Sequence, residues 1–407
     1  MFCEIRPSPF VLGRDDRHEP QKAIRLSVIY KMGRANRDSG KSTVASLASS
    51  AAMPVDGNTR ILETPRSDEL PLNLALERIF MPFATTQRDL AFKEQTGRSL
   101  YEGADDDRLQ FVHYTSADAA LSIIKTKRMW MRNTSCMSDY REVQHGFDIL
   151  QKYFLDKERA AKFAVALDAC APGVAQEAIK IFDQWWTHPA VSTRFNTYIT
   201  SLSMHWAHEN QHGRLSMWRA FGAQNTPRVA VVFSLPKFTA AQAADALNLL
   251  FSPVAYLPEE QVHRVIEEVI SNVHENCDFL RSVDRAAVLN TVFNMLIAGV
   301  TCLKHEGFHE EREWRAIYSP KRNPSSLMDF ATEVVGGAPQ PVYKIPLDAT
   351  INPALATLDF ARIFDRIIIG PSPYPWPMSE AFVEALTKSG VSDAAQRVSL
   401  SMIPIRM

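Results

Sequence analysis

The chain has few cysteines, almost no net charge and no long hydrophobic run, and each absence excludes a class of protein. Its five cysteines are scattered and never spaced as a Cys-x-x-Cys pair, so they predict reduced structural thiols, not a disulfide framework or a zinc site. A net charge of -1 argues against non-specific binding to nucleic acid or to an anionic membrane. The longest apolar run, residues 292–303, is too short to cross a bilayer, and the N-terminal residues do not resemble a signal peptide. We therefore expect a cytoplasmic protein without a membrane partner.

What the chain does contain fits an ordinary globular protein. Its 407 residues are 46% hydrophobic and 22% charged, enough for two domains or for one large domain with an extension. Residues 1–104 begin with a stretch rich in Ser, Thr, Ala, Arg and Pro, which predicts a partly flexible N-terminal extension. Residues 105–407 form the predicted main domain. Its short strands and clustered helices predict an α+β fold with a mixed, largely antiparallel sheet flanked by helices.

The pattern of apolar residues gives the expected elements. Strands are predicted at residues 109–114, 129–131, 197–204, 228–233, 311–318, 342–345 and 366–369. Helices are predicted at residues 72–83, 116–125, 139–153, 160–186, 258–303 as a pair, and 379–388, with a helix-like turn at 215–221.

The segment 303–315, LKHEGFHEEREWR, concentrates four carboxylates, two histidines and three basic side chains. On a strand, Glu311, Glu313 and Arg315 would point to one side, and Arg312 and Trp314 to the other. One interpretation is an ion-pair ladder between strands, which is common and weakly stabilising. The other is that one glutamate serves chemistry while the second, with Arg315, orients it.

Two further groups of residues also have a structural and a functional interpretation. His113, Tyr114, Thr115 and Ser116 lie where a predicted strand meets a helix, so they are either caps and turn formers or a site for ligand hydroxyls. Trp218 and Phe221 are spaced to share one side of a helix, so they are either core residues or a platform for a planar ring. In the second case the neighbouring Arg219 would hold a phosphate.

Two other motifs are weaker. Gly40-Lys41-Ser42-Thr43 looks like part of a phosphate-binding loop, but Ala35 stands where the first glycine is needed, so a flexible serine-rich segment is favoured. The histidines of segment 205–212, HWAHENQH, share helical spacing. No carboxylate or cysteine stands at a familiar metal-site interval from them, so we expect an exposed loop and no metal.

Six stretches, taken together, resemble a widespread bacterial family, the domain of unknown function numbered twenty-nine seventy-one. They are FVHYTS at 111–116, NTSCMSDYRE at 133–142, LSMWRAFG at 215–222, KHEGFHEEREWR at 304–315, IIIGP at 367–371 and SMIPIR at 401–406. The resemblance covers about residues 105–407 in order. One departure is Ser138, where the family usually has asparagine.

A second resemblance is to the ADP-ribosyltransferases, on the His-Tyr-Thr strand end and on Glu311-Arg312-Glu313. It implies NAD as co-substrate, His113 as ribose anchor, Glu313 as catalytic carboxylate and Glu311 as the group that orients the acceptor. The remaining cofactor-binding residues would be Tyr114, Thr115, Ser116, Trp218, Arg219 and Arg315. This sequence has no Ser-Thr-Ser strand, and Trp218 or Phe221 would stack the ring. Such a transferase or NAD glycohydrolase would suit a toxin or phage-defence role.

The alternative is a non-enzymatic sensor or effector module that binds a nucleotide, a small molecule or a partner. Helices at 143–186 and 258–303 would then supply the partner surface. Geometry separates the two functions. A transferase of this type needs His113 and Glu313 on adjacent strands and facing one cleft.

Overall fold

The structure is a computed structural model that describes residues 66–100, 107–136, 140–187, 196–220, 226–236, 240–335 and 337–404. All of these belong to one compact unit, residues 62–407. The glycine-lysine motif at 40–43 and most of the predicted extension lie outside the described residues, as do Phe221 and Ser138.

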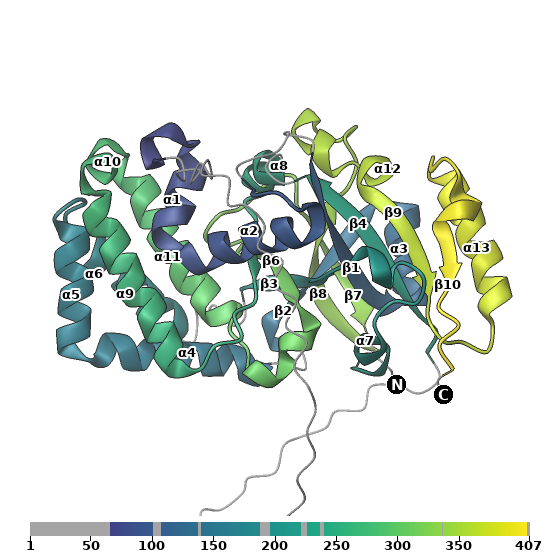
Figure 1. Cartoon of the computed structure of the whole chain (residues 1–407), viewed down its shortest axis with the longest axis horizontal. Helices are drawn as coiled ribbons and strands as arrows, with labels where there is room; N and C mark the ends of the chain where they lie inside the picture. The colour runs from purple at the N-terminus through teal and green to yellow at the C-terminus, as the bar shows by residue number, and fades with distance from the viewer. Residues whose placement is uncertain are drawn as a thin grey trace, which may run out of the picture. The chain divides into compact units, whose positions relative to one another are not determined.

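Ten strands form one sheet (Figure 1). The main path follows the order β10-β9-β4-β1-β3-β2-β8-β7, and β6 joins β3 to β5. Strands β9 and β10 run parallel, and the other strand pairs run antiparallel. The strands are β1 Arg108–Ser116, β2 Arg128–Asn133, β3 Tyr198–Met204, β4 Arg228–Pro236, β5 Leu250–Pro253, β6 Glu313–Tyr318, β7 Asp329–Val335, β8 Ala338–Pro346, β9 Phe364–Ile369 and β10 Val398–Leu400. The predicted α+β class with a mixed, mostly antiparallel sheet is confirmed.

The sheet forks at β3. Strand β6 pairs with β3 along residues 198–203, so it occupies one edge of that strand. On the other edge, β2 pairs with residues 198 and 199 and β1 pairs with residues 203 and 204. Strands β1 and β2 therefore diverge around residues 200–202, where backbone groups of β3 need partners from side chains or solvent.

Helices pack on both faces of the sheet, and most of them gather in one layer (Figure 1). That helical layer shares a core with Ile199 of β3 and Ile317 of β6, and its central helix α11 is apolar over most of its surface. It is built from α1 Leu72–Phe80, α2 Pro82–Thr96, α4 Tyr140–Leu155, α5 Lys157–Asp168, α6 Val174–Thr187, α9 Glu259–Glu275, α10 Cys277–Ser282 and α11 Arg285–Thr301.

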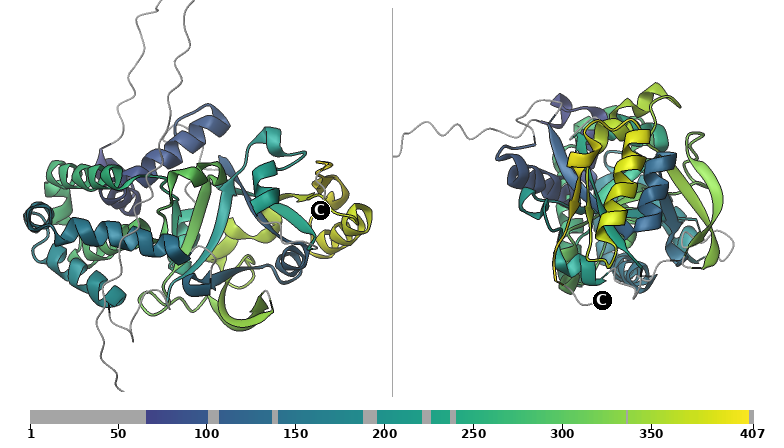
Figure 2. Two further views of the ribbon diagram at one scale, coloured as in Figure 1. Left: turned by 90° about the horizontal axis from the view of Figure 1, so that it is seen from below. Right: turned by 90° about the vertical axis from the view of Figure 1, so that its right-hand side faces the viewer.

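The opposite face of the sheet carries a second core. Phe111, Leu202 and Trp314 are buried there against the remaining helices. Figure 2 shows α13 beside α3 on this side. These helices are α3 Ala117–Thr126, α8 Ala240–Leu247, α12 Phe360–Ile363 and α13 Pro375–Lys388; the short α7 Leu215–Ala220 packs instead against a small third core around Val112 and Tyr114.

Local sequence explains how several helices begin, end and approach one another. The predicted helix at 72–83 is two helices, because Pro82 lacks the N–H needed to continue α1 and opens α2 instead. Ser116 caps α3 as predicted, accepting from the Ala119 N–H at 3.4 Å. Helices α4 and α11 pack closely at Gly146, where a β-carbon would lie 2.6 Å from the Val300 carbonyl oxygen.

Two helices of the predicted extension pack against the rest of the described unit. Helix α1 contacts α9 and α11, and Phe80 at its end is fully buried. Phe92 of α2 is buried in the second core. The domain boundary near residue 105 stays a prediction. None of the described helices is both long enough and apolar enough to cross a membrane.

Candidate functional site

The charged segment of the sequence forms a buried ion cluster of four side chains: Glu313 and Arg315 of β6, with Lys304 and Glu311 from before the strand. Arg315 Nε lies 2.8 Å from Glu313 Oε1, and Arg315 Nη2 lies 3.1 Å from Glu313 Oε2. Lys304 Nζ lies 3.1 Å from Glu313 Oε2 and 2.7 Å from Glu311 Oε2. Arg315 is 1% exposed and Glu313 6%. Glu313, Arg315 and Lys304 are therefore shielded from solvent, Glu311 is partly exposed, and the two anions and two cations compensate one another.

The sheet register explains why these groups meet. Ser203 of β3 lies opposite Glu313, and Ser201 lies opposite Arg315, on the face that the helical layer covers. The Ser201 hydroxyl donates to the Glu313 carboxylate. Arg315 also donates to the carbonyl oxygen of Thr301 at the end of α11. Arg315 thus links the sheet to the helical layer.

Glu311 does not lie on the strand, so the alternation predicted for residues 311–318 is wrong at its start. The chain first makes the 3-10 turn η5, Glu306–Glu311. Arg312 then takes a left-handed conformation with φ 46°, and β6 begins at Glu313. A strand pattern could not reveal this turn, because a run of charged residues fits an exposed strand equally well. Lys304 nevertheless brings both carboxylates to one ammonium group.

The cations set the ionisation of the cluster. Burial alone would raise the pKa of Glu313, but the charges of Arg315 and Lys304 and the hydrogen bonds from Arg315 and Ser201 outweigh it and lower that pKa to about 2. Burial would likewise lower the pKa of Lys304, and the charge of Glu313 with contacts to Glu311 raises it instead. At neutral pH Glu313 is an anion, and both of its oxygens already have partners.

His113 sits in the fork of the sheet. Its Nδ1 lies 2.9 Å from the carbonyl oxygen of Ser201, so the ring serves a backbone group that the diverging strands leave unpaired. Burial lowers the pKa of His113 although this hydrogen bond opposes the shift. Strand β3 separates β1 from β6, and the pairing of Val112 with Ser203, and of Ser203 with Glu313, puts Val112 on the Glu313 face. His113, the next residue of β1, therefore points to the other face.

The residues after His113 have structural partners. The Tyr114 hydroxyl accepts from the backbone N–H of Arg214 at 2.8 Å. Burial raises the pKa of Tyr114 to about 12, so the phenol is neutral. Thr115 is half-buried and pairs with Val229, and Ser116 caps α3. These contacts agree with the interpretation of caps and turn formers.

Trp218 is a core residue in this structure. Its indole is 5% exposed, lies edge to face with Tyr114, and donates to the His212 carbonyl oxygen at 2.8 Å. A β-carbon on Gly370 would lie 2.8 Å from the ring, so that glycine is needed for the contact. Arg219 is exposed on α7. Trp218 therefore packs in the third core, and Arg219 lies at the surface beside it.

The histidines of segment 205–212 differ in their surroundings. His205 is fully buried with its Nε2 2.9 Å from Asn210 Oδ1, whereas His208 is exposed. The ring of His212 contacts the Ser401 carbonyl oxygen. Within the described part of the chain, no group of three His, Cys, Asp or Glu side chains is placed to hold a metal ion.

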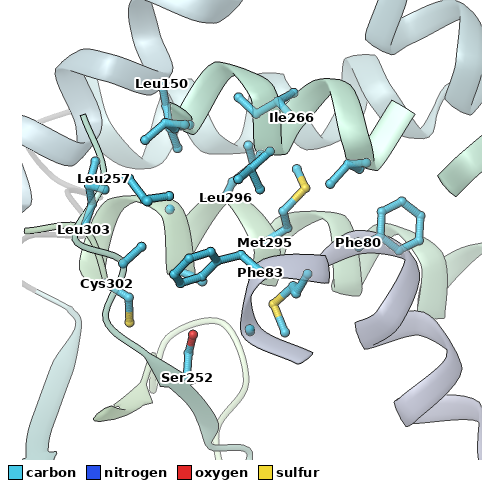
Figure 3. A pocket seen from close by; sticks show the side chains of 18 of the residues that line it. Phe80, Phe83, Leu150, Ser252, Leu257, Ile266, Met295, Leu296, Cys302 and Leu303 are labelled. Atoms are coloured by element: carbon cyan, nitrogen blue, oxygen red, sulfur yellow. The ribbon is translucent and has the colours of Figure 1, made fainter. Parts of the chain in front are cut away.

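An apolar cavity of about 100 Å³ lies inside the helical layer (Figure 3). Helices α1, α2, α4, α9 and α11 surround it, and β5 closes one end. Ser252 and Cys302 lie near one another at that end (Figure 3). The rest of the lining is aliphatic and aromatic and includes Phe80, Phe83, Leu150, Leu257, Ile266, Met295, Leu296 and Leu303.

The cavity and the ion cluster share a wall. Ser252 of β5 pairs with Arg315 of β6, and Cys302 follows Thr301, which accepts a hydrogen bond from Arg315. Burial raises the pKa of the Cys302 thiol to about 11, although the charge of Arg315 opposes this. The thiol is protonated at neutral pH and is therefore a weak nucleophile. The cavity offers an apolar surface with one hydroxyl and one thiol at its end.

Sequence reasoning missed this cavity and a second buried ion pair. The cavity is made by residues from 80 to 303 that no local pattern connects. In the ion pair, Arg214 Nε lies 2.9 Å from Glu209 Oε1, and Arg214 also donates to the carbonyl oxygens of Met204 and Glu310. Burial would raise the pKa of Glu209, and Arg214 lowers it. The only signal was two opposite charges in a polar segment, which is too common to be informative.

Comparison with known proteins gives one family match, over part of the chain, and no activity. No curated protein and no solved structure matches the chain. Residues 217–316, which run from α7 to β6 and include Trp218, Arg219, Glu311, Glu313 and Arg315, match the family model described as Protein of unknown function (DUF2971), so the family indicated by the sequence motifs is confirmed over this segment.

Proposed function

We propose that this chain is a small-molecule-binding module of the sensor or effector type, and that its ligand is an apolar molecule held in the cavity of the helical layer. The observation that carries the proposal is the apolar cavity of about 100 Å³, which is partly open to solvent. An apolar ligand that filled it would remove its apolar lining from water, which stabilises the complex by about 25 cal/mol per Å² of apolar area buried.

The lining indicates the class of ligand. A ring or a short aliphatic chain suits walls such as Phe83, Met295 and Leu296, and a single polar group would meet Ser252 and Cys302. The charged side chains next to that end of the cavity are Glu313, Arg315 and Lys304, and they already compensate one another within the ion cluster. A phosphate would find no free cation there, so the cavity favours an apolar small molecule over a nucleotide.

Thermal unfolding with and without benzene or indole tests the proposal. Ligand that binds only the folded state raises the melting temperature, and saturation to about a hundred times Kd adds about 2.7 kcal/mol. Ala298→Leu places a larger side chain into the cavity and should abolish this increase. A second apolar cavity, of about 90 Å³, lies on the other face of the sheet. Ala244→Leu fills that one and should leave the increase intact, whereas loss in Ala244→Leu alone would reject the proposed site.

An NAD-using transferase or glycohydrolase is the second candidate, although His113 and Glu313 lie on strands that β3 separates and point to different faces of the sheet, which does not meet the geometric requirement of such a transferase. One observation favours it: Ser201 connects the expected ribose anchor to the expected catalytic carboxylate, because its carbonyl oxygen bonds His113 and its hydroxyl bonds Glu313. Chemistry at Glu313 would require the carboxylate to leave Arg315 and Lys304 and meet the ribose. Toxin or phage-defence duty would belong to this candidate, with a protein or nucleic acid as acceptor.

Incubation of the full chain with NAD labelled in its nicotinamide tests the second candidate. We expect no release of nicotinamide above the blank. Release that is lost in Glu313→Gln under conditions where circular dichroism shows this variant to be folded, but kept in Glu177→Gln, a matched change at an exposed ion pair, would instead establish the transferase or glycohydrolase and displace the binding module.

A further inference from the structure

Strand β7 is a long and exposed sheet edge. It ends the sheet path and pairs with β8. The β7–β8 hairpin lies at the margin of the fold (Figure 2). Phe330 and Val334 are 61% and 66% exposed, although both are large and apolar. The other strands at sheet ends, β10 and β5, have only three and four residues, against seven in β7.

Natural proteins usually protect such an edge with lysine, proline, a bulge or a covering element. The sequence of β7, DFATEVV, has neither lysine nor proline, and its register with β8 runs without interruption from Asp329 to Val335. Both carboxylates of β7 pair with cations of its own sheet, so, as far as the described residues show, the edge is open to another strand.

The backbone N–H and C=O groups of β7 that do not bond to β8 recur at every second residue. Val335 pairs with Ala338, and only two residues of sequence separate them, so these two form a hydrogen-bonded pair. Pairs of this kind recur at every second residue of an antiparallel ladder. The N–H and C=O groups of Phe330, Thr332 and Val334 consequently point away from β8.

We propose that β7 is a self-association surface, on which a second copy of the chain adds its own β7 antiparallel around a two-fold axis at Thr332. In that register Phe330 of each copy lies opposite Val334 of the other, and each pair exchanges the outward N–H and C=O groups. Phe330 already contacts Tyr343 with ring centroids 5.2 Å apart. The second copy therefore extends an existing row of apolar side chains.

The charges of β7 permit this pairing. Each carboxylate has a cation of its own sheet: Arg128 lies 2.8 Å from Asp329, and Lys344 lies 2.5 Å from Glu333. Across the two-fold axis, Glu333 lies opposite Ala331 and Asp329 opposite Val335, so like charges do not face each other. A shift by one residue along each strand would remove the contact between Phe330 and Val334. The register centred on Thr332 is therefore the favoured one.

The contact is small, so the dimer should be weak. Stable dimers bury about 1,200 Å² or more in total, and one pair of edge strands of this length buries less. We expect monomers in dilute solution and dimers at high concentration.

Sedimentation velocity of the full chain from about 1 µM to about 500 µM tests the proposal, a range that covers weak dissociation constants. Phe330→Lys places a charge on the edge, and Thr332→Pro removes an outward N–H without touching the bonds to β8. Both should weaken dimerisation at least about tenfold, or 1.4 kcal/mol. Trp376→Lys, at another exposed aromatic on α13, should leave it unchanged. A wild-type chain that stays monomeric throughout, or a dimer that survives both β7 variants, would overturn the proposal.

Discussion

Replacement of Glu313 by glutamine should destabilise the fold strongly, because the ion cluster would keep its cations and lose its central anion. Arg315 is 1% exposed and Lys304 2%, and Glu311 alone would remain to compensate them. Removing one partner of a buried ion pair costs about 3–5 kcal/mol. The pKa gives a similar value: a fall from 4.5 to about 2 in a buried carboxyl corresponds to about 3 kcal/mol at 1.36 kcal/mol per unit.

The free energy of unfolding should be measured by urea titration at pH 7, with Glu177→Gln as the matched control. Glu177 pairs with Arg285 at 2.6 Å on the surface, with about half of each side chain exposed, so its replacement should cost less than about 1 kcal/mol. A loss below about 1 kcal/mol in Glu313→Gln would refute a structural role for the cluster.

The pH dependence of the free energy of unfolding is an independent test of the ion cluster. Because the folded pKa of Glu313 is depressed, its contribution to stability is complete above about pH 4.5 and is lost as pH falls toward about 2. Glu313→Gln should lack this component, so the stability difference between wild type and variant should shrink across that window. A difference that stayed constant from pH 5 to pH 2.5 would contradict the assignment of the shift to Glu313.

Other predictions test single features of the fold. Gly146→Ala should cost about 1–3 kcal/mol, because its β-carbon would press on the Val300 carbonyl oxygen; a urea titration that shows no loss, as helix propensity alone would give for alanine at an uncrowded helical position, would refute the crowding. Ser116→Ala should cost about 1 kcal/mol by removing the α3 cap, and Ser116→Asp should restore it. Limited proteolysis should cut first between Arg37 and Arg66, and equal resistance of that segment would count against a flexible extension.

Sequence periodicity identified most of the sheet because its strands are buried on at least one face. Strand β1 was predicted within two residues of its bounds, and its helix α3 was predicted with its cap. Strand β7 was missed, because an exposed edge strand with Thr332 and Glu333 among its apolar residues lacks clear alternation. The sequence contains Pro82, but the apolar pattern of a helix continues on both sides of it. One helix was therefore predicted where the structure has two.

The candidate site was less predictable than the fold. Charge density drew attention to residues 303–315, where the structure has an ion cluster, but the partners of those charges depend on register and on α11. Glu313 meets Ser201 from a strand more than a hundred residues away, and local sequence carries no information about that pairing. His113 and Glu313 both form hydrogen bonds with Ser201, from different faces of the sheet. This arrangement depends on the divergence of β1 and β2 along one edge of β3.

The most direct test of the central claim is a crystal structure of the full chain determined under xenon pressure, since xenon enters apolar cavities that lack a ligand. We predict a xenon site, or an apolar ligand retained from the cell, between Phe83 and Met295 with Cys302 and Ser252 at its end. The second cavity, beside Leu202 and Ala244, is the internal control for gas access. Side chains that fill the first cavity, or xenon in the second cavity alone, would contradict the claim that the helical layer holds a ligand.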